Sequence, residues 1–261
     1  MEQELARSNI SYRNPRLYDE LQADNAATAL CTALIEAYGP SGAQTVLDLG
    51  CGTGQALGHL ARRFTYVGID VQPLLIDYGR QVRPTLDLQV GDLRETRLGR
   101  SVDAIICVGN VLAYLHTTAD LTSAFATFAA HAHPGTVLIL GTLVAASPAA
   151  LHSAAPVTQR VDTATAHASV TVRHEWNLHH QIETTYRHWR FDDGTEAEDC
   201  IRRRVVFPRE LELYLNTAGF DLLEIIPDGH GGEVTGPGAY IVARSTRHRG
   251  NTVQSSSGSV G

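Results

Sequence analysis

The sequence contains no lysine, so all 21 of its basic residues are arginine, in a chain of 261 residues. Without lysine there is no side chain for Schiff-base or pyridoxal-phosphate chemistry, and none for a Walker phosphate-binding loop. The four cysteines (Cys31, Cys51, Cys107 and Cys200) lie far apart and form no C-x-x-C pair. This spacing argues against a metal site or a disulfide framework, and it favours a reducing compartment.

Long apolar runs and excess positive charge are also missing. No stretch approaches the roughly 20 apolar residues of a membrane-spanning helix, and the polar N-terminus has no apolar signal core. The net charge of −7 argues against a dedicated nucleic-acid binder. We therefore expect a cytoplasmic protein with neither nucleic-acid nor membrane partners, and a homodimer is left open.

The sequence does contain short apolar runs that alternate with helical patterns as far as residue 143. Strands are predicted at VLDLG, YVGID, LQVGD, DAIICV and TVLILGTL, and later at FDLLEIIP and AYIVARS. Helical stripes separate them, including one over residues 56–64 and a longer one that we expect to end at Pro134-Gly135. The alternation predicts an α/β fold with a Rossmann-like, doubly wound, seven-stranded sheet.

The texture of the sequence changes after residue 143. Residues 144–160 are rich in Ala, Ser and Pro, and three β-rich runs follow within 161–207. We interpret these runs as an antiparallel β insertion that acts as a lid on the core. The expected organisation is an N-terminal helical cap (1–45), a ligand-binding core (46–143), the connection and lid (144–207), the last helix and strands of the core (208–244) and a disordered tail (245–261).

The strongest local signal is the glycine-rich turn in VLDLGCGTG (46–54). Its three glycines allow a tight turn and a close approach of the backbone to a ligand. The dinucleotide fingerprint G-x-G-x-x-G fails in both registers, because Gln55 or Leu57 stands at the third glycine position. An NAD-dependent oxidoreductase therefore stays only a remote alternative, and a non-catalytic binding module is a rarer one.

Acidic residues follow or end the first three predicted strands. Asp48 precedes the glycine turn, Asp70 ends the second strand and Asp92 ends the third. An acid after the second strand is suited to accept hydrogen bonds from ribose hydroxyls. The three acids and the turn together predict one nucleoside-shaped site at the carboxyl edge of the sheet.

These motifs resemble a class I S-adenosylmethionine-dependent methyltransferase over roughly residues 44–143, with the terminal strands extending the match to about 244. The resemblance implies S-adenosylmethionine as cofactor, with the glycine turn at its methionine and ribose portion, Asp70 at the ribose diol and Asp92-Leu93 at the adenine. The cofactor-binding residues expected from it are Tyr18, Asp48, Gly50, Cys51, Gly52, Gly54, Asp70, Val71, Asp92, Leu93, Cys107, Val108 and Asn110.

The substrate class follows from a finer resemblance. Tyr18-Asp19, the segment YLHTTADL and the β insertion resemble glycine, sarcosine, amino-sugar and natural-product methyltransferases. VGNVLAYL stands where base methyltransferases carry a Pro-Pro-aromatic motif, and the acidic cluster of Mg²⁺-dependent members is missing. We expect methylation of an amine nitrogen on a small molecule. The alternative is C- or O-methylation of an electron-rich aromatic such as an indole or a phenol.

The lid supplies the candidates for catalysis, because histidine is the natural base near neutral pH. We expect His174 and His188, with Tyr186, to act in catalysis, since each histidine shares a strand face with aromatic side chains. Tyr12, Tyr114 and Trp176 are the expected acceptor-binding residues. Arg202-Arg203-Arg204 is interpreted as a solvated strand edge, with binding of an acidic substrate as the alternative.

Overall fold

The larger of two sheets in the computed structural model has seven strands, and the model describes residues 9–22, 26–145, 155–227 and 238–246. Its strand order is β10-β11-β5-β4-β1-β2-β3. β11 runs antiparallel to both of its neighbours, β10 and β5, and all other adjacent strands of this sheet are parallel. The strands are β1 (Thr45–Leu49), β2 (Thr65–Asp70), β3 (Asp87–Val90), β4 (Val102–Cys107), β5 (Ala132–Thr142), β10 (Phe220–Pro227) and β11 (Ala239–Ser245).

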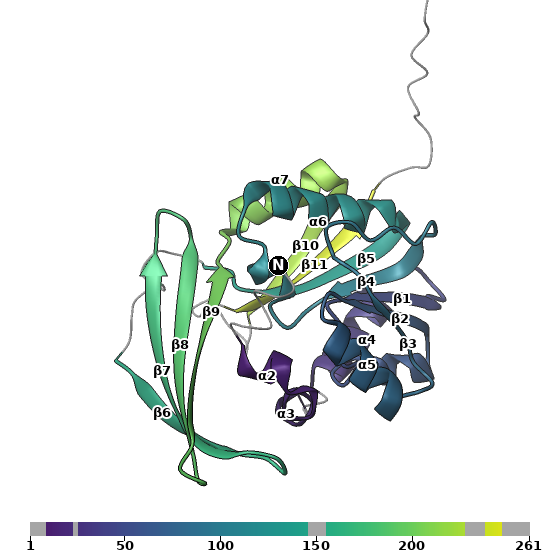
Figure 1. The fold of residues 1–261 in the computed structure, drawn as a ribbon. Coiled ribbons are helices and arrows are strands. Elements are labelled where there is room, and N and C mark those ends of the chain that lie inside the picture. The colour runs from purple at the N-terminus through teal and green to yellow at the C-terminus, as the bar shows by residue number, and fades with distance from the viewer. Residues whose placement is uncertain (1–8, 23–25, 146–154, 228–237, 247–261) are drawn as a thin grey trace, which may run out of the picture.

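Helices cover both faces of this sheet (Figure 1). On one face α4 (Ala26–Tyr38) and α5 (Pro73–Val82) bury apolar side chains against β1, β2 and β4. On the other, α6 (Thr118–Ala130) and α7 (Pro208–Ala218) do the same. The predicted Rossmann-like, doubly wound sheet is confirmed, and its parallel strands all carry their carboxyl ends to one edge.

A separate sheet of four antiparallel strands has the order β6-β7-β8-β9. In Figure 1 it stands beside the larger sheet, and α2 (Ile10–Arg13) and α3 (Pro15–Leu21) lie between the two. The predicted antiparallel insertion is thus confirmed. Its strands are β6 (Val157–Asp162), β7 (His167–Asn177), β8 (Ile182–Phe191) and β9 (Glu196–Arg204).

Three local expectations differ from the structure. The helix expected after the glycine turn is only a 3₁₀ helix, η1 (Gly58–Arg62), and another, η2 (Val111–Tyr114), follows β4. β5 begins at Ala132, so Pro134-Gly135 lies inside a strand, where Gly135 takes a φ of +92°. β6 lies partly in the expected connection, and most of its residues are exposed, so it lacks the alternation that marks a half-buried strand.

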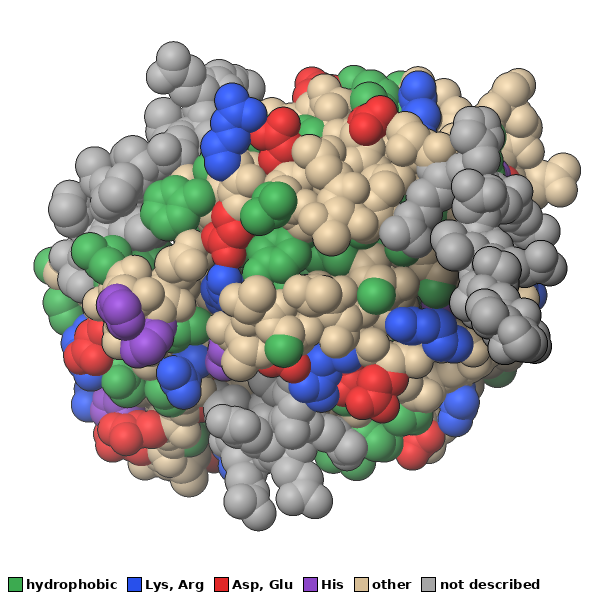
Figure 2. Space-filling model, turned by 90° about the horizontal axis from the view of Figure 1, so that it is seen from above, with side chains coloured by type: hydrophobic (Ala, Val, Ile, Leu, Met, Phe, Trp, Pro, Cys, Tyr) green, Lys and Arg blue, Asp and Glu red, His purple; other side chains and the backbone are tan. Residues whose placement is uncertain are grey.

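The surface carries charges of both signs side by side. On the face shown in Figure 2, basic side chains lie among acidic ones. Among the helices of the described residues, none is long and apolar enough to cross a membrane. The predicted tail falls almost wholly outside the described residues.

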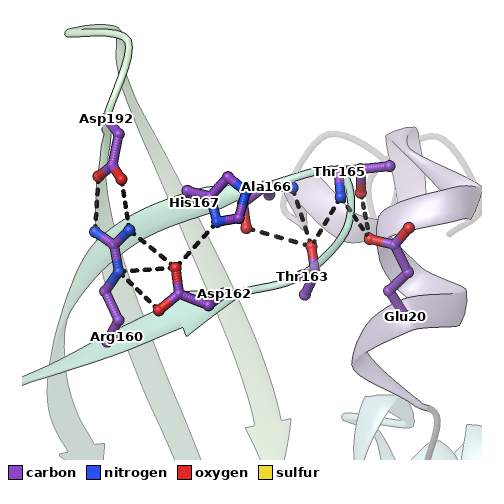
Figure 3. Close-up of polar contacts among 8 residues, drawn as sticks. All are labelled: Glu20, Arg160, Asp162, Thr163, Thr165, Ala166, His167 and Asp192. Carbon is purple, nitrogen blue, oxygen red and sulfur yellow. Dashed lines mark hydrogen bonds and ion pairs between the residues drawn. The ribbon is translucent and has the colours of Figure 1, made fainter.

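The N-terminal segment, residues 9–22, connects the two sheets through neighbouring acids on α3. Asp19 accepts two hydrogen bonds from Arg83 of the core, at 3.0 and 2.7 Å. Glu20 instead accepts hydrogen bonds from the N–H and hydroxyl of Thr165, in the turn between β6 and β7 (Figure 3). Consecutive helix positions point about 100° apart, so one short helix holds both the core and the lid.

We predict that Asp19→Asn loosens the N-terminal segment from the core. The Asp19–Arg83 ion pair is partly buried, so its loss should weaken docking by roughly 1–2 kcal/mol. Amide hydrogen exchange in residues 10–21 should then become about 5–30-fold faster. The control is Glu36→Gln, which removes an exposed ion pair with Arg63 and should leave this exchange unchanged. Equal exchange in both variants would contradict the docking role.

Candidate active site

A cavity of about 300 Å³ lies at the carboxyl ends of β1, β2 and β4. Its wall comes from three parts of the molecule, which are the core, the N-terminal segment and the four-stranded sheet. In open α/β sheets this edge is where ligands bind. Its charged lining residues are two acids from the core and two arginines from the lid, namely Asp48, Asp70, Arg187 and Arg203.

The glycine turn after β1 requires residues without a side chain at positions 50 and 52. Gly50 and Gly52 have φ angles of +93° and +57°, a region that L side chains rarely adopt. A Cβ on Gly52 would lie 2.5 Å from the hydroxyl oxygen of Tyr18. The backbone of the turn therefore packs directly against Tyr18, which also lines the cavity.

Asp70 anchors that turn to the end of β2. Its Oδ2 accepts a hydrogen bond from the Gly52 N–H at 2.8 Å, and its Oδ1 accepts one from the Gln72 N–H at 2.8 Å. Burial raises the pKa of Asp70, although these backbone donors oppose the shift. The carboxylate thus shapes the turn while it lines the cavity.

Asp48 is the second acid of the cavity wall and is 2% exposed. Burial raises its pKa to about 7, although the Tyr66 hydroxyl, which donates a hydrogen bond to Oδ2 at 2.5 Å, lowers it. Asp48 therefore carries a proton part of the time near neutral pH. A cationic group in the cavity would favour its ionised form.

Asp92, expected at the adenine, does not line the cavity. Arg94 binds both of its carboxylate oxygens and also pairs with Asp120 at 2.7 Å. Although burial opposes the shift, the bonds and charge of Arg94 hold the pKa of Asp92 below its ordinary value. Its neighbours Gly91 and Leu93 do line the cavity, so the apolar side chain takes the place expected for the acid.

Three tyrosines meet in the cavity wall, and one of them, Tyr18, packs against the glycine turn. The Tyr12 hydroxyl donates a hydrogen bond to the Tyr114 hydroxyl at 3.0 Å, and the Tyr12 ring lies 5.8 Å from that of Tyr18, centroid to centroid. Burial raises the pKa of Tyr12 and of Tyr18 well above the ordinary value. Both hydroxyls stay protonated near neutral pH and act as hydrogen-bonding groups rather than as bases.

The lid turns only one face of its sheet toward the cavity. We call this the cavity face, and it includes His174, Trp176, Glu183, Thr185, Arg187, Trp189, Asp199, Ile201 and Arg203. Side chains of directly paired residues share a face, and His174 pairs with Thr185 while Arg187 pairs with Asp199. Arg187 and Arg203 are the members of this face that reach the cavity wall.

The pairing register corrects the expectation for His188 and Tyr186. His188 pairs with Thr171 and Glu198, so its side chain lies on the outer face, where it contacts Glu196. Tyr186 lies on that face too, under the guanidinium of Arg173. Each strand showed the expected alternation, but even positions of β7 share a face with odd positions of β8, so the two histidines point to opposite sides.

His174 lies on the cavity face without reaching the cavity wall. Its Nδ1 is 2.5 Å from Oε1 of Glu183, a side chain that is 2% exposed. Trp176 also stays out of the cavity, because it packs against Leu143 and Val205 of the core. Both residues therefore lie on the face that includes the cavity-lining arginines, but neither belongs to the cavity wall, contrary to the prediction.

The cavity brings together most of the residues expected at the cofactor. Gly52 and Gly54 are outside the lining, as are Asp92 and Cys107, whereas both expected acceptor tyrosines belong to it. Arg187 and Asn9 line the cavity without having been predicted, and Arg203 lines it although the solvated strand edge was the preferred interpretation for it. The expected residues in the lining are Tyr12, Tyr18, Asp48, Gly50, Cys51, Asp70, Val71, Leu93, Val108, Asn110 and Tyr114.

The triple arginine at the end of β9 is less solvated than predicted. Only Arg202 is exposed; Arg203 lines the cavity, and the buried Arg204 pairs with Glu210. Across the described ranges, no group of three or more His, Cys, Asp and Glu side chains has the arrangement of a metal site.

Comparison with known proteins identifies the central part of this fold. The family model for the methyltransferase domain matches residues 46–135. The chain carries a class I methyltransferase domain. The predicted resemblance is thereby confirmed, and the cofactor of this class is S-adenosylmethionine.

Two curated relatives of the methyltransferase domain act on amino sugars according to their names. One is dTDP-3-amino-3,4,6-trideoxy-alpha-D-glucopyranose N,N-dimethyltransferase of Streptomyces venezuelae, 35% identical over 99 residues, or 38% of this chain and 42% of the relative. The other is dTDP-3-amino-3,6-dideoxy-alpha-D-glucopyranose N,N-dimethyltransferase of Streptomyces fradiae, 35% identical over 109 residues, or 41% and 42%. The chain thus spans about two fifths of the length of the curated relatives it matches.

A solved structure shares the fold over nearly the whole chain. It is a SAM-bound amino pentose methyltransferase from Micromonospora echinaspora, with a TM-score of 0.73 at 23% identity, covering 91% of this chain and 97% of its own. The methyltransferase domain and its four-stranded lid therefore belong to one shared architecture.

We predict that the titration of Asp48 makes the folded protein less stable as the pH rises. The unfolded chain ionises Asp48 near pH 3.8 and the folded chain near pH 7, so between these values the folded state holds the extra proton. Each pH unit in that window should remove about 1.4 kcal/mol of unfolding free energy. The contribution is complete below the lower pKa and lost above the higher one.

The variant Asp48→Asn isolates this effect, because its amide oxygen still accepts the Tyr66 hydrogen bond. Denaturant unfolding of both proteins should show wild type losing roughly 2 kcal/mol relative to the variant between pH 5 and pH 6.5. A difference that stays constant across this range would refute the raised pKa of Asp48.

Proposed function

We propose that this chain transfers a methyl group from S-adenosylmethionine to the amine nitrogen of a small molecule. The observation that carries the proposal is one continuous cavity, which extends from the glycine turn, Asp48 and Asp70 to the tyrosines of the N-terminal segment. The methyltransferase domain match supports the reaction type. The names of the curated relatives support an amine acceptor, and within that class an amino sugar.

The residues at the core end of the cavity fit the cofactor. Gly50 lines the cavity with backbone alone, so the cofactor can lie against bare backbone there. The positions that a Cβ would take on Gly50 and Gly52 are occupied by the side chains of Val111 and Tyr18, which pack on the turn. Asp70 offers carboxylate oxygens at the strand end where the ribose is expected, and Asp48 supplies negative charge beside a cationic ligand. Bound S-adenosylmethionine supplies a methyl group already activated by a sulfonium.

The acceptor end is formed by Tyr12, Tyr114 and the lid. Alignment of the attacking nitrogen contributes to the rate by holding it in a reactive position. The hydroxyls of Tyr12 and Tyr114 are placed to hydrogen-bond the amine without taking its proton. Tyr18, packed on the glycine turn, excludes water from the region between the two ligands.

The aromatic alternative loses its main support. It rested on a lid rich in Trp, Tyr and His, but Trp176, Tyr186 and Trp189 are not in the cavity wall. We keep a small-molecule acceptor without nucleic acid as part of the proposal. The homodimer and the cytoplasmic location stay predictions, and light scattering in solution checks the first of them.

The proposal is tested by incubating the protein with S-adenosylmethionine carrying a labelled methyl group and a panel of acceptors. The panel contains dTDP-linked amino sugars, free amino sugars, glycine, sarcosine, an indole and a phenol. Mass spectrometry should find the label on an amine nitrogen. Labelling of only the aromatic acceptors, or of none, would overturn the proposed function.

Asp70→Ala is predicted to weaken cofactor binding. Loss of the charged acceptor, and of its bond to the glycine turn, should reduce affinity by roughly 1.5–3 kcal/mol, or about 10–150-fold. Isothermal titration with S-adenosylmethionine measures it, and the exposed Asp77→Asn on α5 serves as control. Unchanged affinity in a folded Asp70→Ala protein would remove Asp70 from the cofactor site.

The two lid histidines are predicted to behave differently in single-turnover methyl transfer. His188→Ala should stay within about threefold of wild type, because this outer-face residue is remote from the cavity. His174→Ala should lower the rate about tenfold, less than the 10²–10⁴ of a general base, since it acts only through Glu183. A hundredfold loss in His188→Ala would contradict the register, and no loss in His174→Ala would make that residue purely structural.

A further inference from the structure

Two arginines of the lid line the same cavity as the expected cofactor site, and the proposed reaction does not use them. Arg187 extends from β8 and Arg203 from β9, both on the cavity face. Their side chains are 18% and 24% exposed, so they are largely withdrawn from solvent. A guanidinium stays charged at any physiological pH, and it needs an anionic partner wherever it is desolvated.

Contacts with the lid and with the N-terminal segment hold the guanidinium of Arg187 in a fixed position. Its Nε and Nη2 donate to the two carboxylate oxygens of Asp199 at 2.7 and 2.5 Å, and Nη2 also donates to Oδ1 of Asn9 at 2.9 Å. The Asp199 side chain is 0% exposed, and the guanidinium lies over the Trp189 ring. These contacts fix the plane of the guanidinium.

Arg203 is held in the same way by a second buried acid. Its Nε donates to Glu183 Oε2 at 2.9 Å, and its Nη2 donates to the Thr185 hydroxyl at 3.0 Å. Although burial opposes the shift, the charge of Arg203 keeps the pKa of Glu183 below its ordinary value. Within the described residues, Nη1 has no hydrogen-bond partner in either arginine.

The charges of the cavity wall are therefore separated by position. The acids that no arginine contacts, Asp48 and Asp70, lie at the core end, and the two arginines lie at the lid end. A cation suits the first end, because its acids have no cationic partner among the described residues. At the second end each arginine is already paired with a buried acid, so an anion there would be bound by hydrogen bonds from the guanidinium N–H groups rather than by excess charge. An anion at the lid end would also satisfy the free Nη1 groups.

We infer that Arg187 and Arg203 form a subsite for an oxyanion of the methyl acceptor, a phosphate or a carboxylate attached to the amine-bearing molecule. The planar guanidinium fork matches both groups. Docking the anion at the lid would direct the rest of the acceptor toward the core end, where the methyl group is expected. This inference rests on the proposed function for the identity of the ligand as acceptor, but the anion site itself is testable without turnover.

The test is a titration of inorganic pyrophosphate, and separately of malonate, into the protein saturated with S-adenosylhomocysteine. The demethylated cofactor fills the core end, so the probe reports on the lid end. Arg203→Gln should weaken binding of the better probe by about tenfold or more. Arg202→Gln is the matched control, because this neighbour lies on the outer face and is exposed.

Arg187→Gln alone would leave Asp199 buried and unpaired, so the double variant Arg187→Gln/Asp199→Asn removes both charges and protects the fold. It should lose anion binding about tenfold while its affinity for S-adenosylhomocysteine stays within about twofold. Tighter binding of pyrophosphate assigns a phosphate to the acceptor, and tighter binding of malonate assigns a carboxylate.

Equal anion affinity in wild type, Arg203→Gln and the double variant would overturn the subsite, as would an equal loss in Arg202→Gln. The failure of the proposed function is recognised separately. In that case the protein binds no S-adenosylhomocysteine or transfers no methyl group, while the anion titration of the unliganded protein still reports on the arginines.

Discussion

The hydrogen bond from the Gly52 N–H to the Asp70 carboxylate is the contact on which the cavity depends. It joins the turn after β1 to the end of β2 and holds Gly50 and Cys51 of the turn in the cavity wall. Gly52 also touches Tyr18 of the N-terminal segment, where any Cβ would collide with the hydroxyl. The Gly52 peptide group thus fixes how the N-terminal segment packs on the core. A side chain at position 52 would push that segment away from the cavity.

The buried acids at the two ends of the cavity have different partners. At the lid, the buried acids Glu183 and Asp199 are matched by arginines, so the ion pairs stabilise the lid without excess charge. At the core, Asp48 and Asp70 receive hydrogen bonds from neutral donors only, among the described residues. Burial without a cation raises the pKa of both acids, and a cationic ligand would relieve that penalty.

Much of the fold and of the core end could be predicted because the signals are local. A short, mainly apolar run, Val46-Leu47-Asp48-Leu49, followed by glycines defines β1 and its turn without reference to the rest of the chain. The lid face could not be predicted in this way. Whether His188 or Arg187 faces the cavity depends on the register between β7 and β8, which no pattern within β8 reveals.

The buried Trp189 offered a usable signal, because it shares a face with Arg187 rather than with His188. The sequence of β6 offered no comparable signal, because most of its residues are exposed and show no alternation. The position of the Asp92 carboxylate could not be predicted either. It forms an ion pair with Arg94, only two residues away, and the conformation of this short loop determines which group the acid binds.

The composition of the cavity wall also bears on which acceptor suits it. Among its described residues there is no histidine, the buried tyrosines stay neutral and the arginines cannot accept a proton. The two acids of the wall, Asp48 and Asp70, lie at the core end, where the cofactor is expected, rather than at the acceptor end. A phenol, with an ordinary pKa near 10, becomes a strong nucleophile only when a base removes its proton before attack. A neutral amine attacks through its lone pair and releases a proton only after methylation, when water can accept it. An acceptor end that holds the acceptor in place but offers no base of its own therefore suits nitrogen better than phenolic oxygen.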